Sequence, residues 1–315
     1  YSIRDGYDLI GTNHCFCGNQ RIPDIWYGEK KEGSTVKKNK RTRRFSAGKL
    51  LVYIFLSIAS ILSLFPFYWM FVMATRPSSA FNSIPPTITP GNMLVENFNK
   101  VLNSIDFFGS MWNSFVICII VTVVVLFISS LAGYAFAKFS FRGKNVLFIA
   151  ILLTMIIPPQ LGLIPQYFLI SNAGLLDTLP GVMVLFFLNP LGIFLMRQYI
   201  SKSVPDELME AAKLDGCSNF RIYRSIVVPI ILPAFATLGI IVFTAVWGEF
   251  LWQFTVLRDP ENYTIQVALA QLSNTRDVDF GMIMSGVFWA TVPLLVVFLF
   301  FNKLFISSIT EGSVK

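Results

Sequence analysis

Residues 201–229 read SKSVPDELMEAAKLDGCSNFRIYRSIVVP, and this polar stretch between two long apolar runs decides how the rest of the chain is interpreted. Ser203, followed three residues later by Asp206, is a strong helix start. Gly216 is a good helix stop, and a second start, a serine, follows two residues after it. The stretch therefore predicts a helix, a glycine turn and a second helix, which together form a compact knob.

The first of these helices is predicted to carry its small and apolar residues largely on one side, namely Leu208, Ala211, Ala212 and Leu214. Two adjacent alanines allow another protein's surface to come close. The alternative is an amphipathic connector that lies on a lipid surface. A lone Glu-Ala-Ala tripeptide would favour that alternative, because such residues suit any helix.

Six apolar runs around this knob predict a polytopic membrane protein. Hydrophobic residues make up 54% of the 315-residue chain and charged residues only 14%, with a mean hydropathy of +0.63. Soluble domains carry about 25% charged residues, so an ordinary soluble globule is excluded. Each run has the roughly 20 residues that a helix needs to cross a bilayer. The predicted spans lie near 50–73, 112–137, 146–170, 179–199, 226–251 and 280–302.

Prolines 158, 159 and 165 interrupt the third run, which is predicted to bend near its outer end. The distribution of positive charge predicts the orientation. Seven Lys and Arg residues lie in 37–49 and five in 197–224, whereas the connections on the other side hold only Arg76, Lys100, Arg258 and Arg276. Positive loops stay in the cytoplasm, so both termini are predicted to be cytoplasmic. This placement also explains the net charge of +7 without nucleic-acid binding.

The amino-terminal residues 1–47 are polar and basic, and they are predicted to form a flexible cytoplasmic tail. They contain no apolar stretch of the kind found in signal peptides. His14, Cys15 and Cys17 offer at most three metal ligands, whereas structural zinc takes four. We therefore predict no metal site.

The longer pattern in the polar stretch is Glu210-Ala211-Ala212, three residues, Gly216, nine residues, then Ile226-x-x-Pro229. It resembles the EAA loop in the membrane subunits of bacterial ABC importers. Trp247-Gly248-Glu249-Phe250-Leu251 is similar to the Trp-Asn-Glu-Phe-Leu motif of the carbohydrate-type, MalG-like branch, with Gly248 in place of Asn. The resemblance covers roughly residues 48–315.

The resemblance implies an all-α membrane protein with six transmembrane helices in the type I importer (MetI-like) permease fold. It divides the chain into a first transmembrane helix with an outer loop at 48–108, a transmembrane domain at 109–305 and a cytoplasmic tail at 306–315. The EAA coupling loop occupies 200–225 within that domain. Such subunits are found in the bacterial plasma or inner membrane.

The resemblance also assigns roles to residues. The chain lacks the Gly-x-x-x-x-Gly-Lys-Ser/Thr loop that cradles phosphates, so a partner would have to hydrolyse ATP. The resemblance implies that the EAA loop sits in a groove on that separate ATPase. ATP and Mg²⁺ would then bind the ATPase subunits, with no cofactor on this chain. The coupling residues would be Glu210, Ala211, Ala212, Leu214, Asp215 and Gly216. The last residues, Gly312, Ser313, Val314 and Lys315, would reach the ATPase too, although a mobile tail is the commoner fate of chain ends.

Glu249 is the one carboxylate near the interior of a predicted span, about 34 Å along the fifth one and so near its outer end. An ionisable residue in a membrane is a functional candidate by default, whereas at the interface a structural hydrogen bond is as good an interpretation. Trp247 and Trp252 would line the translocation pathway with it. The alternative is an aromatic belt at the membrane interface.

These observations predict a non-catalytic permease subunit that forms half of the pathway for a sugar or oligosaccharide. Its predicted partners are a second similar permease, an ATPase dimer, an extracytoplasmic solute-binding protein and membrane lipid. Three alternatives stay open. One is a permease for another solute, another is an ATP-independent secondary transporter, and the third is a membrane enzyme, which a chain with a single His disfavours.

Overall fold

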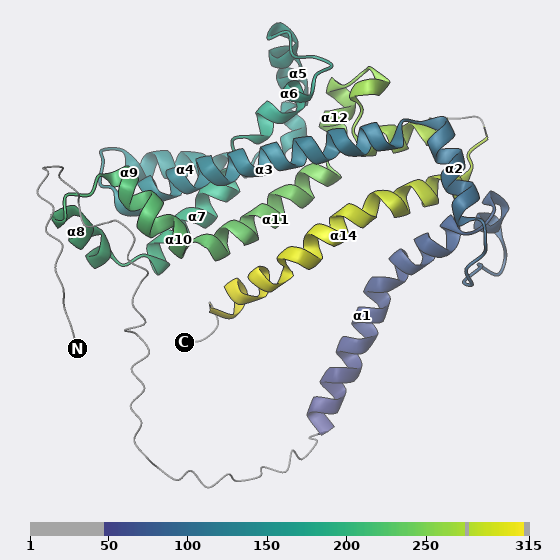
Figure 1. The fold of residues 1–315 in the computed structure, drawn as a ribbon, viewed down its shortest axis with the longest axis horizontal. Helices are drawn as coiled ribbons and strands as arrows, with labels where there is room; N and C mark the ends of the chain where they lie inside the picture. Colours follow the sequence, from purple (N-terminus) through teal and green to yellow (C-terminus); the bar gives the residue numbers. More distant parts are fainter. Residues whose placement is uncertain (1–46, 275–276, 312–315) are drawn as a thin grey trace, which may run out of the picture.

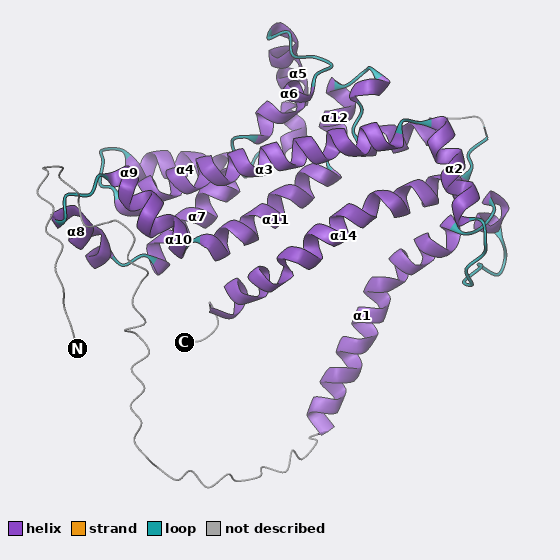
Figure 2. Cartoon of the chain, in the orientation of Figure 1, coloured by secondary structure: helices purple, strands orange, loops and turns teal. Residues whose placement is uncertain are grey.

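The computed structural model describes residues 47–274 and 277–311. Within these ranges all regular structure is helical (Figure 2). The predicted tail at 1–47 lies almost wholly outside the described residues, as do the ligand candidates His14, Cys15 and Cys17 and the predicted ATPase contact at 312–315. The all-α prediction is confirmed for the described part.

Three long apolar helices are each long enough to cross a membrane, and they match the first, second and sixth predicted spans. These are α1 (Ala47–Ala74), α3 (Phe107–Lys138) and α14 (Phe280–Glu311). At 1.5 Å per residue, the 28 residues of α1 extend about 42 Å, which exceeds the thickness of a hydrocarbon core.

The other three predicted spans are each broken into two helical segments, although a bend was predicted only for the third. The third consists of α4 (Lys144–Thr154) and, after a 3₁₀ turn at Pro159–Gly162, α5 (Leu163–Asn172), with a bend of 92°. The bend was predicted, but it follows only 11 residues of helix rather than lying near one end. Two consecutive prolines explain it, because they remove backbone donors and restrict the residue before them.

The fourth and fifth predicted spans bend by 44° and 77°. The fourth comprises α6 (Leu179–Met183), a 3₁₀ turn (Val184–Phe186) and α7 (Pro190–Ser203). The fifth comprises α9 (Asn219–Ile222), a π-helical turn (Tyr223–Val227), α10 (Val228–Ile230) and α11 (Leu232–Gly248). If each bent pair counts as one span, the structure has up to six.

Short helices fill the connections. Helix α2 (Leu94–Ser104) lies between α1 and α3, and helix α13 (Ile265–Gln271) lies between α12 (Leu251–Val256) and α14 in the chain. Helix α8 (Asp206–Leu214) lies between α7 and α9, and 3₁₀ turns occur at Ser78–Asn82, Pro260–Asn262 and Leu272–Asn274.

In Figure 1, α3 extends along the molecule, with α8 and α9 beyond its carboxyl end and α2 at its amino end. It packs most extensively on α7 and also on α11. Glycines permit this closeness. A Cβ on Gly133 would lie 2.7 Å from the Met196 Cβ, and a Cβ on Gly192 would lie 2.5 Å from the Ser129 hydroxyl. The core of the protein lies along these helices.

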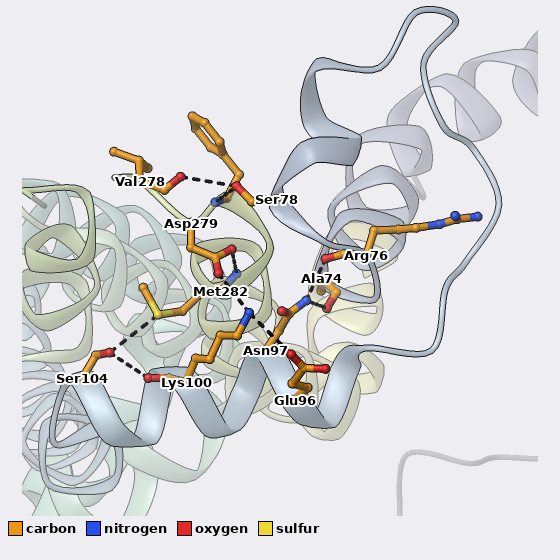
Figure 3. A network of polar contacts seen from close by, with 11 residues as sticks. Ala74, Arg76, Ser78, Glu96, Asn97, Lys100, Ser104, Val278, Asp279 and Met282 are labelled. Atoms are coloured by element: carbon orange, nitrogen blue, oxygen red, sulfur yellow. Dashed lines mark hydrogen bonds and ion pairs between the residues drawn. The ribbon is translucent and has the colours of Figure 1, made fainter. Parts of the chain in front are cut away.

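Helix α1 diverges from the other helices except near its carboxyl end, where a polar network joins it to α2 and α14 (Figures 1 and 3). The fully buried Asn97 amide donates hydrogen bonds to the carbonyls of Ala74 (2.9 Å) and Arg76 (2.8 Å). Lys100 forms an ion pair of 3.1 Å with Asp279, just before α14. These contacts satisfy the carbonyls left free where α1 ends.

Candidate functional site

The predicted knob is present as α8, a glycine turn and α9. Gly216 has a φ of +75°, a conformation that suits glycine. Its N–H bonds to the Lys213 carbonyl and the Cys217 N–H to the Ala212 carbonyl, both at 3.0 Å. This is the paired pattern that ends helices at a left-handed residue. Ser218 then caps α9 by accepting the Arg221 N–H. The turn and the second helix start are confirmed.

Helix α8 starts close to the predicted position, but Ser203 does not cap it. The helix begins at Asp206, but Ser203 is the last residue of α7, and no side chain caps the amino end of α8. Asp206 instead accepts a hydrogen bond from Lys138, the last residue of α3, at 2.6 Å. That bond and the charge of Lys138 hold the pKa of Asp206 below its usual value.

Exposure separates the predicted coupling residues into two groups. Glu210, Ala211, Asp215, Gly216 and Leu214 are exposed, the last at 90%. Ala212 is only 4% exposed and packs into the protein's own core together with Met209. The prediction that Ala212 shares one face with Leu208, Ala211 and Leu214 is therefore wrong. Met209 and Ala212 are three residues apart, so they lie on one face of α8, and that face packs on the bundle.

Two anchors attach the knob to α3. On the entry side, Lys138 also donates to the carbonyl of Val204, the residue that ends α7. On the exit side, the Tyr223 hydroxyl lies 2.7 Å from that of Ser130, and both residues are buried. Sequence reasoning missed both anchors, because the pairs are 68 and 93 residues apart.

Glu249 is not inside a helix, contrary to its predicted place in a continuous fifth span. Helix α11 ends at Gly248, and the Glu249 carboxylate accepts the main-chain N–H of Trp252, 2.8 Å away, in the first turn of α12. A carboxylate is a favourable partner for the free N–H groups at a helix start. The Trp252 indole donates to the Val182 carbonyl at 3.3 Å, which fixes its orientation.

Glu249 and Trp252 line a groove of about 420 Å³ at the break between α4 and α5. Its other polar side chains include Gln160, Gln166 and Asn189, none of which was predicted. Two of them adjoin prolines at helix breaks, which is the sequence feature that could have indicated them. Trp247 does not join this groove. It lines a separate cavity of about 190 Å³ between α11, α13 and α14.

The segment 257–265 is tied to two other parts of the chain. The Asp177 carboxylate accepts the main-chain N–H groups of Arg258 (2.8 Å) and Asp259 (3.0 Å). Near the amino end of α3, the Asn113 amide donates to the carbonyls of Glu261 (2.9 Å) and Tyr263 (3.1 Å). The segment is thus held in a defined conformation.

No group of three or more His, Cys, Asp or Glu residues that could hold a metal occurs in the described ranges. The cysteines there, Cys118 and Cys217, are buried and form no disulfide.

Comparison with known proteins identifies relatives over most of the chain. The family model for the binding-protein-dependent transport system inner membrane component matches residues 125–310. The arabinooligosaccharides transport system permease protein AraQ of Bacillus subtilis is 33% identical, over 86% of this chain and 98% of that protein. The lactose transport system permease protein LacG of Rhizobium radiobacter is 34% identical, over 84% of this chain and 96% of that protein.

The sn-glycerol-3-phosphate transport system permease protein UgpE of Salmonella choleraesuis is 30% identical, over 82% of this chain and 94% of that protein. A solved structure of a bacterial ABC transporter involved in the import of alginate has a chain with the same fold. Its TM-score is 0.71 at 23% identity, and the match covers 82% of this chain and 96% of that chain. The predicted permease fold is confirmed, and the chain belongs to the family of inner membrane components of binding-protein-dependent transport systems.

Proposed function

We propose that this chain is one membrane subunit of an ABC importer and forms half of the translocation pathway for a sugar or oligosaccharide. Family membership supports the importer, and the names of two relatives, which transport arabinooligosaccharides and lactose, support the solute class. ATP and Mg²⁺ would bind separate ATPase subunits, and this chain would do no chemistry of its own.

The observation that carries the proposal is the exposed knob. Glu210 and Leu214 project from α8 into solvent, and Gly216 shapes the turn beside them. Three apolar side chains of the knob, Leu208, Leu214 and Phe220, are exposed, and apolar surface of this kind supports a contact with another protein. We assign contact with the ATPase to the exposed residues of the predicted coupling set, namely Glu210, Ala211, Leu214, Asp215 and Gly216. Ala212 would instead hold α8 in place by packing it on the bundle.

The orientation follows from charge. Lys138 at the carboxyl end of α3 bonds to Asp206 at the start of α8, and the predicted cytoplasmic loops hold most of the basic residues. The knob would therefore face the cytoplasm with both termini, and the segment 257–265 would face the other side. A binding protein would meet that side. A related alginate transporter has been solved in complex with a pentasaccharide-bound periplasmic protein.

The groove beside the α4–α5 break suits a neutral polyhydroxylated solute. It combines two glutamine amides, Asn189, Glu249 and the aromatic Trp252, and no Lys or Arg is among the described residues that line it. Amides donate hydrogen bonds to hydroxyl groups and accept them, and a carboxylate accepts them, whereas a phosphate ester would call for cationic partners. The second permease would supply the opposite wall.

Two alternatives follow from specific observations. UgpE, a relative named for sn-glycerol-3-phosphate, shows that close family members carry solutes other than sugars. An ATP-independent transporter would work without the exposed knob, which leaves that feature unexplained.

Affinity purification of the tagged protein from mild detergent tests the proposal. An ATPase subunit and a second permease should accompany the native chain, and the complex should hydrolyse ATP. The Glu210→Ala/Gly216→Pro double variant should lose this activity, while Arg142→Ala, in another predicted cytoplasmic loop, should retain it. Lactose and arabinooligosaccharides can then be screened for stimulation. Purification of the native protein alone, without ATPase activity, would refute the importer.

A further inference from the structure

The helix α3 is attached at its carboxyl end to both sides of the knob. Lys138 bonds to Val204 before α8 and to Asp206 at its start, and Ser130 bonds to Tyr223 after it. The Lys138 side chain is only 6% exposed, so water competes little with these bonds. The ammonium group also lies where the carboxyl ends of α3 and α7 meet, which favours a positive charge.

These attachments form a row on one face of α3. Ser130, Tyr134 and Lys138 are spaced by four residues, and such residues lie above one another on a helix. The ring of the buried Tyr134 packs at 5.7 Å from that of Tyr223, between the two anchors. More than two helical turns of α3 therefore contact the knob, although the chain connects the knob covalently only to α7 and α11.

The other end of α3 holds the segment 257–265. Asn113 donates to the carbonyls of Glu261 and Tyr263, and the buried Ser114 hydroxyl accepts the main-chain N–H of Ile265 at 2.8 Å. These bonds lie in the first two turns of the helix. The two ends of α3 therefore bond to different segments, its amino end to the segment 257–265 and its carboxyl end to the knob. Figure 1 shows α3 extending between them.

Between these ends α3 is continuous. Its 32 residues extend about 48 Å and contain no proline. The long helices α1 and α14 contain Pro66 and Pro293, and the other predicted spans bend by 44° to 92°. Helix α3 therefore lacks the prolines at which helices usually kink, so we treat it as one rigid element.

We propose that α3 is the rod that carries movement of the α8 knob to the segment 257–265, with Lys138 and Asn113 as the positioning residues at its two ends. The inference rests on the proposed function, because an ATPase must move α8. It assigns the coupling between the two faces to one continuous helix that is held at both ends, and rigid secondary elements are among the structures that carry coupling between distant sites.

The test follows the segment 257–265 while ATP acts on the knob. In the purified complex carrying Glu261→Cys, alkylation of that cysteine by a membrane-impermeant maleimide is measured with and without Mg-ATP, by mass spectrometry of the peptide. Glu261 is exposed, and only its carbonyl bonds to Asn113, so the substitution preserves that contact. We expect ATP to change the alkylation rate by at least about fivefold, the lower range of ordinary coupling between sites.

Adding Lys138→Met or Asn113→Ala should abolish this change while ATP hydrolysis and subunit composition stay as in the parent. Lys138→Arg keeps the donors and should preserve the change, as should Lys202→Met, which removes an exposed lysine from the end of α7. The inference would be overturned if ATP still changed the alkylation rate fully in both Lys138→Met and Asn113→Ala. It would also be overturned if these variants lost subunit assembly and not the response to ATP. If the parent complex contains no ATPase, the proposed function itself has failed.

Discussion

The hydroxyl groups of Ser130 and Tyr223 lie 2.7 Å apart in the interior of the protein and join α3 to the π-helical turn that follows the knob. Ser130 also donates to the Phe127 carbonyl at 3.0 Å, so the tyrosine is the donor of the pair. Only the short helix α10 separates this turn from the bend of 77° at the start of α11. This bond therefore fixes the direction in which the chain leaves the knob.

Removal of the donor and removal of the acceptor of this hydrogen bond are predicted to lower the stability of the protein by different amounts. Tyr223→Phe removes the donor but leaves Ser130 bonded to Phe127, so it should lower the free energy of unfolding by only about 1 kcal/mol. Ser130→Ala leaves the tyrosine hydroxyl buried without its partner and should cost up to about 3 kcal/mol. Denaturant titration in detergent measures both. Equal losses would contradict this assignment of donor and acceptor.

Gly133 is predicted to tolerate no side chain. A Cβ there would lie 2.7 Å from the Met196 Cβ and 2.8 Å from the Arg197 backbone nitrogen, neither of which can move without shifting α7. Gly133→Ala should therefore cost about 1–3 kcal/mol. Gly239→Ala is the matched control, because its nearest neighbours would be 3.7 Å away. It should be neutral or stabilising by up to about 1 kcal/mol through helix propensity. Melting temperatures compare the two variants.

Asp177 is predicted to make the segment 257–265 sensitive to acid. Partial burial acts to raise the pKa of this carboxyl, but hydrogen bonds from the Arg258 and Asp259 N–H groups and from Asn262, with the charge of Arg258, hold the pKa below its usual value. The ionised form thus favours the folded state. This contribution is complete above the unfolded pKa of about 3.9 and is lost as the pH falls through the lower folded value.

Asp177→Asn keeps one acceptor and tolerates the φ of +58°, so it should remove the acid sensitivity at a small cost. Asp177→Ala should lose stability even at neutral pH. Thermal unfolding from about pH 6 to pH 3 tests this, with tryptic cleavage after Arg258 at neutral pH as a local probe. If Asp177→Asn loses as much stability in acid as the native protein does, other carboxyl groups cause the acid sensitivity.

Glu249 is predicted to have a structural role that can be separated from transport. Glu249→Gln keeps an oxygen that accepts the Trp252 N–H, so stability should be close to that of the native protein. Glu249→Ala should cost about 1 kcal/mol, the usual price of a lost helix cap. If the glutamine variant is stable but imports solute more slowly, the carboxylate contacts the solute. If uptake by Glu249→Gln is unchanged, the role of Glu249 is only to cap α12.

Local sequence patterns predicted the parts of this protein that depend on neighbouring residues. Uninterrupted apolar runs marked α1, α3 and α14, and Gly216 marked the left-handed turn that ends α8. Both features are set within a few residues of the chain. The positions of the breaks were missed, because whether a proline bends a helix or ends it depends on what satisfies the freed carbonyls.

The contacts that define the site could not be predicted, because they join distant parts of the chain. In the sequence, Lys138 is only one more basic residue after a predicted span. Its contact with Asp206 is visible only in the folded protein, where the end of α3 meets the start of α8. Ala212 reads as part of an exposed face, but the bundle buries it. Glu249 was predicted to lie inside a helix, because Gly248 was interpreted as one residue of a continuous apolar run rather than as the end of α11.

The most direct test of the central claim is solute uptake into vesicles reconstituted with the purified complex, with Mg-ATP enclosed on the side of the knob and the solute-loaded binding protein outside. The account predicts uptake of a neutral oligosaccharide that requires both ATP and the binding protein and that is lost in the Glu210→Ala/Gly216→Pro variant. Uptake that proceeds equally without ATP, or that survives this variant, would contradict it.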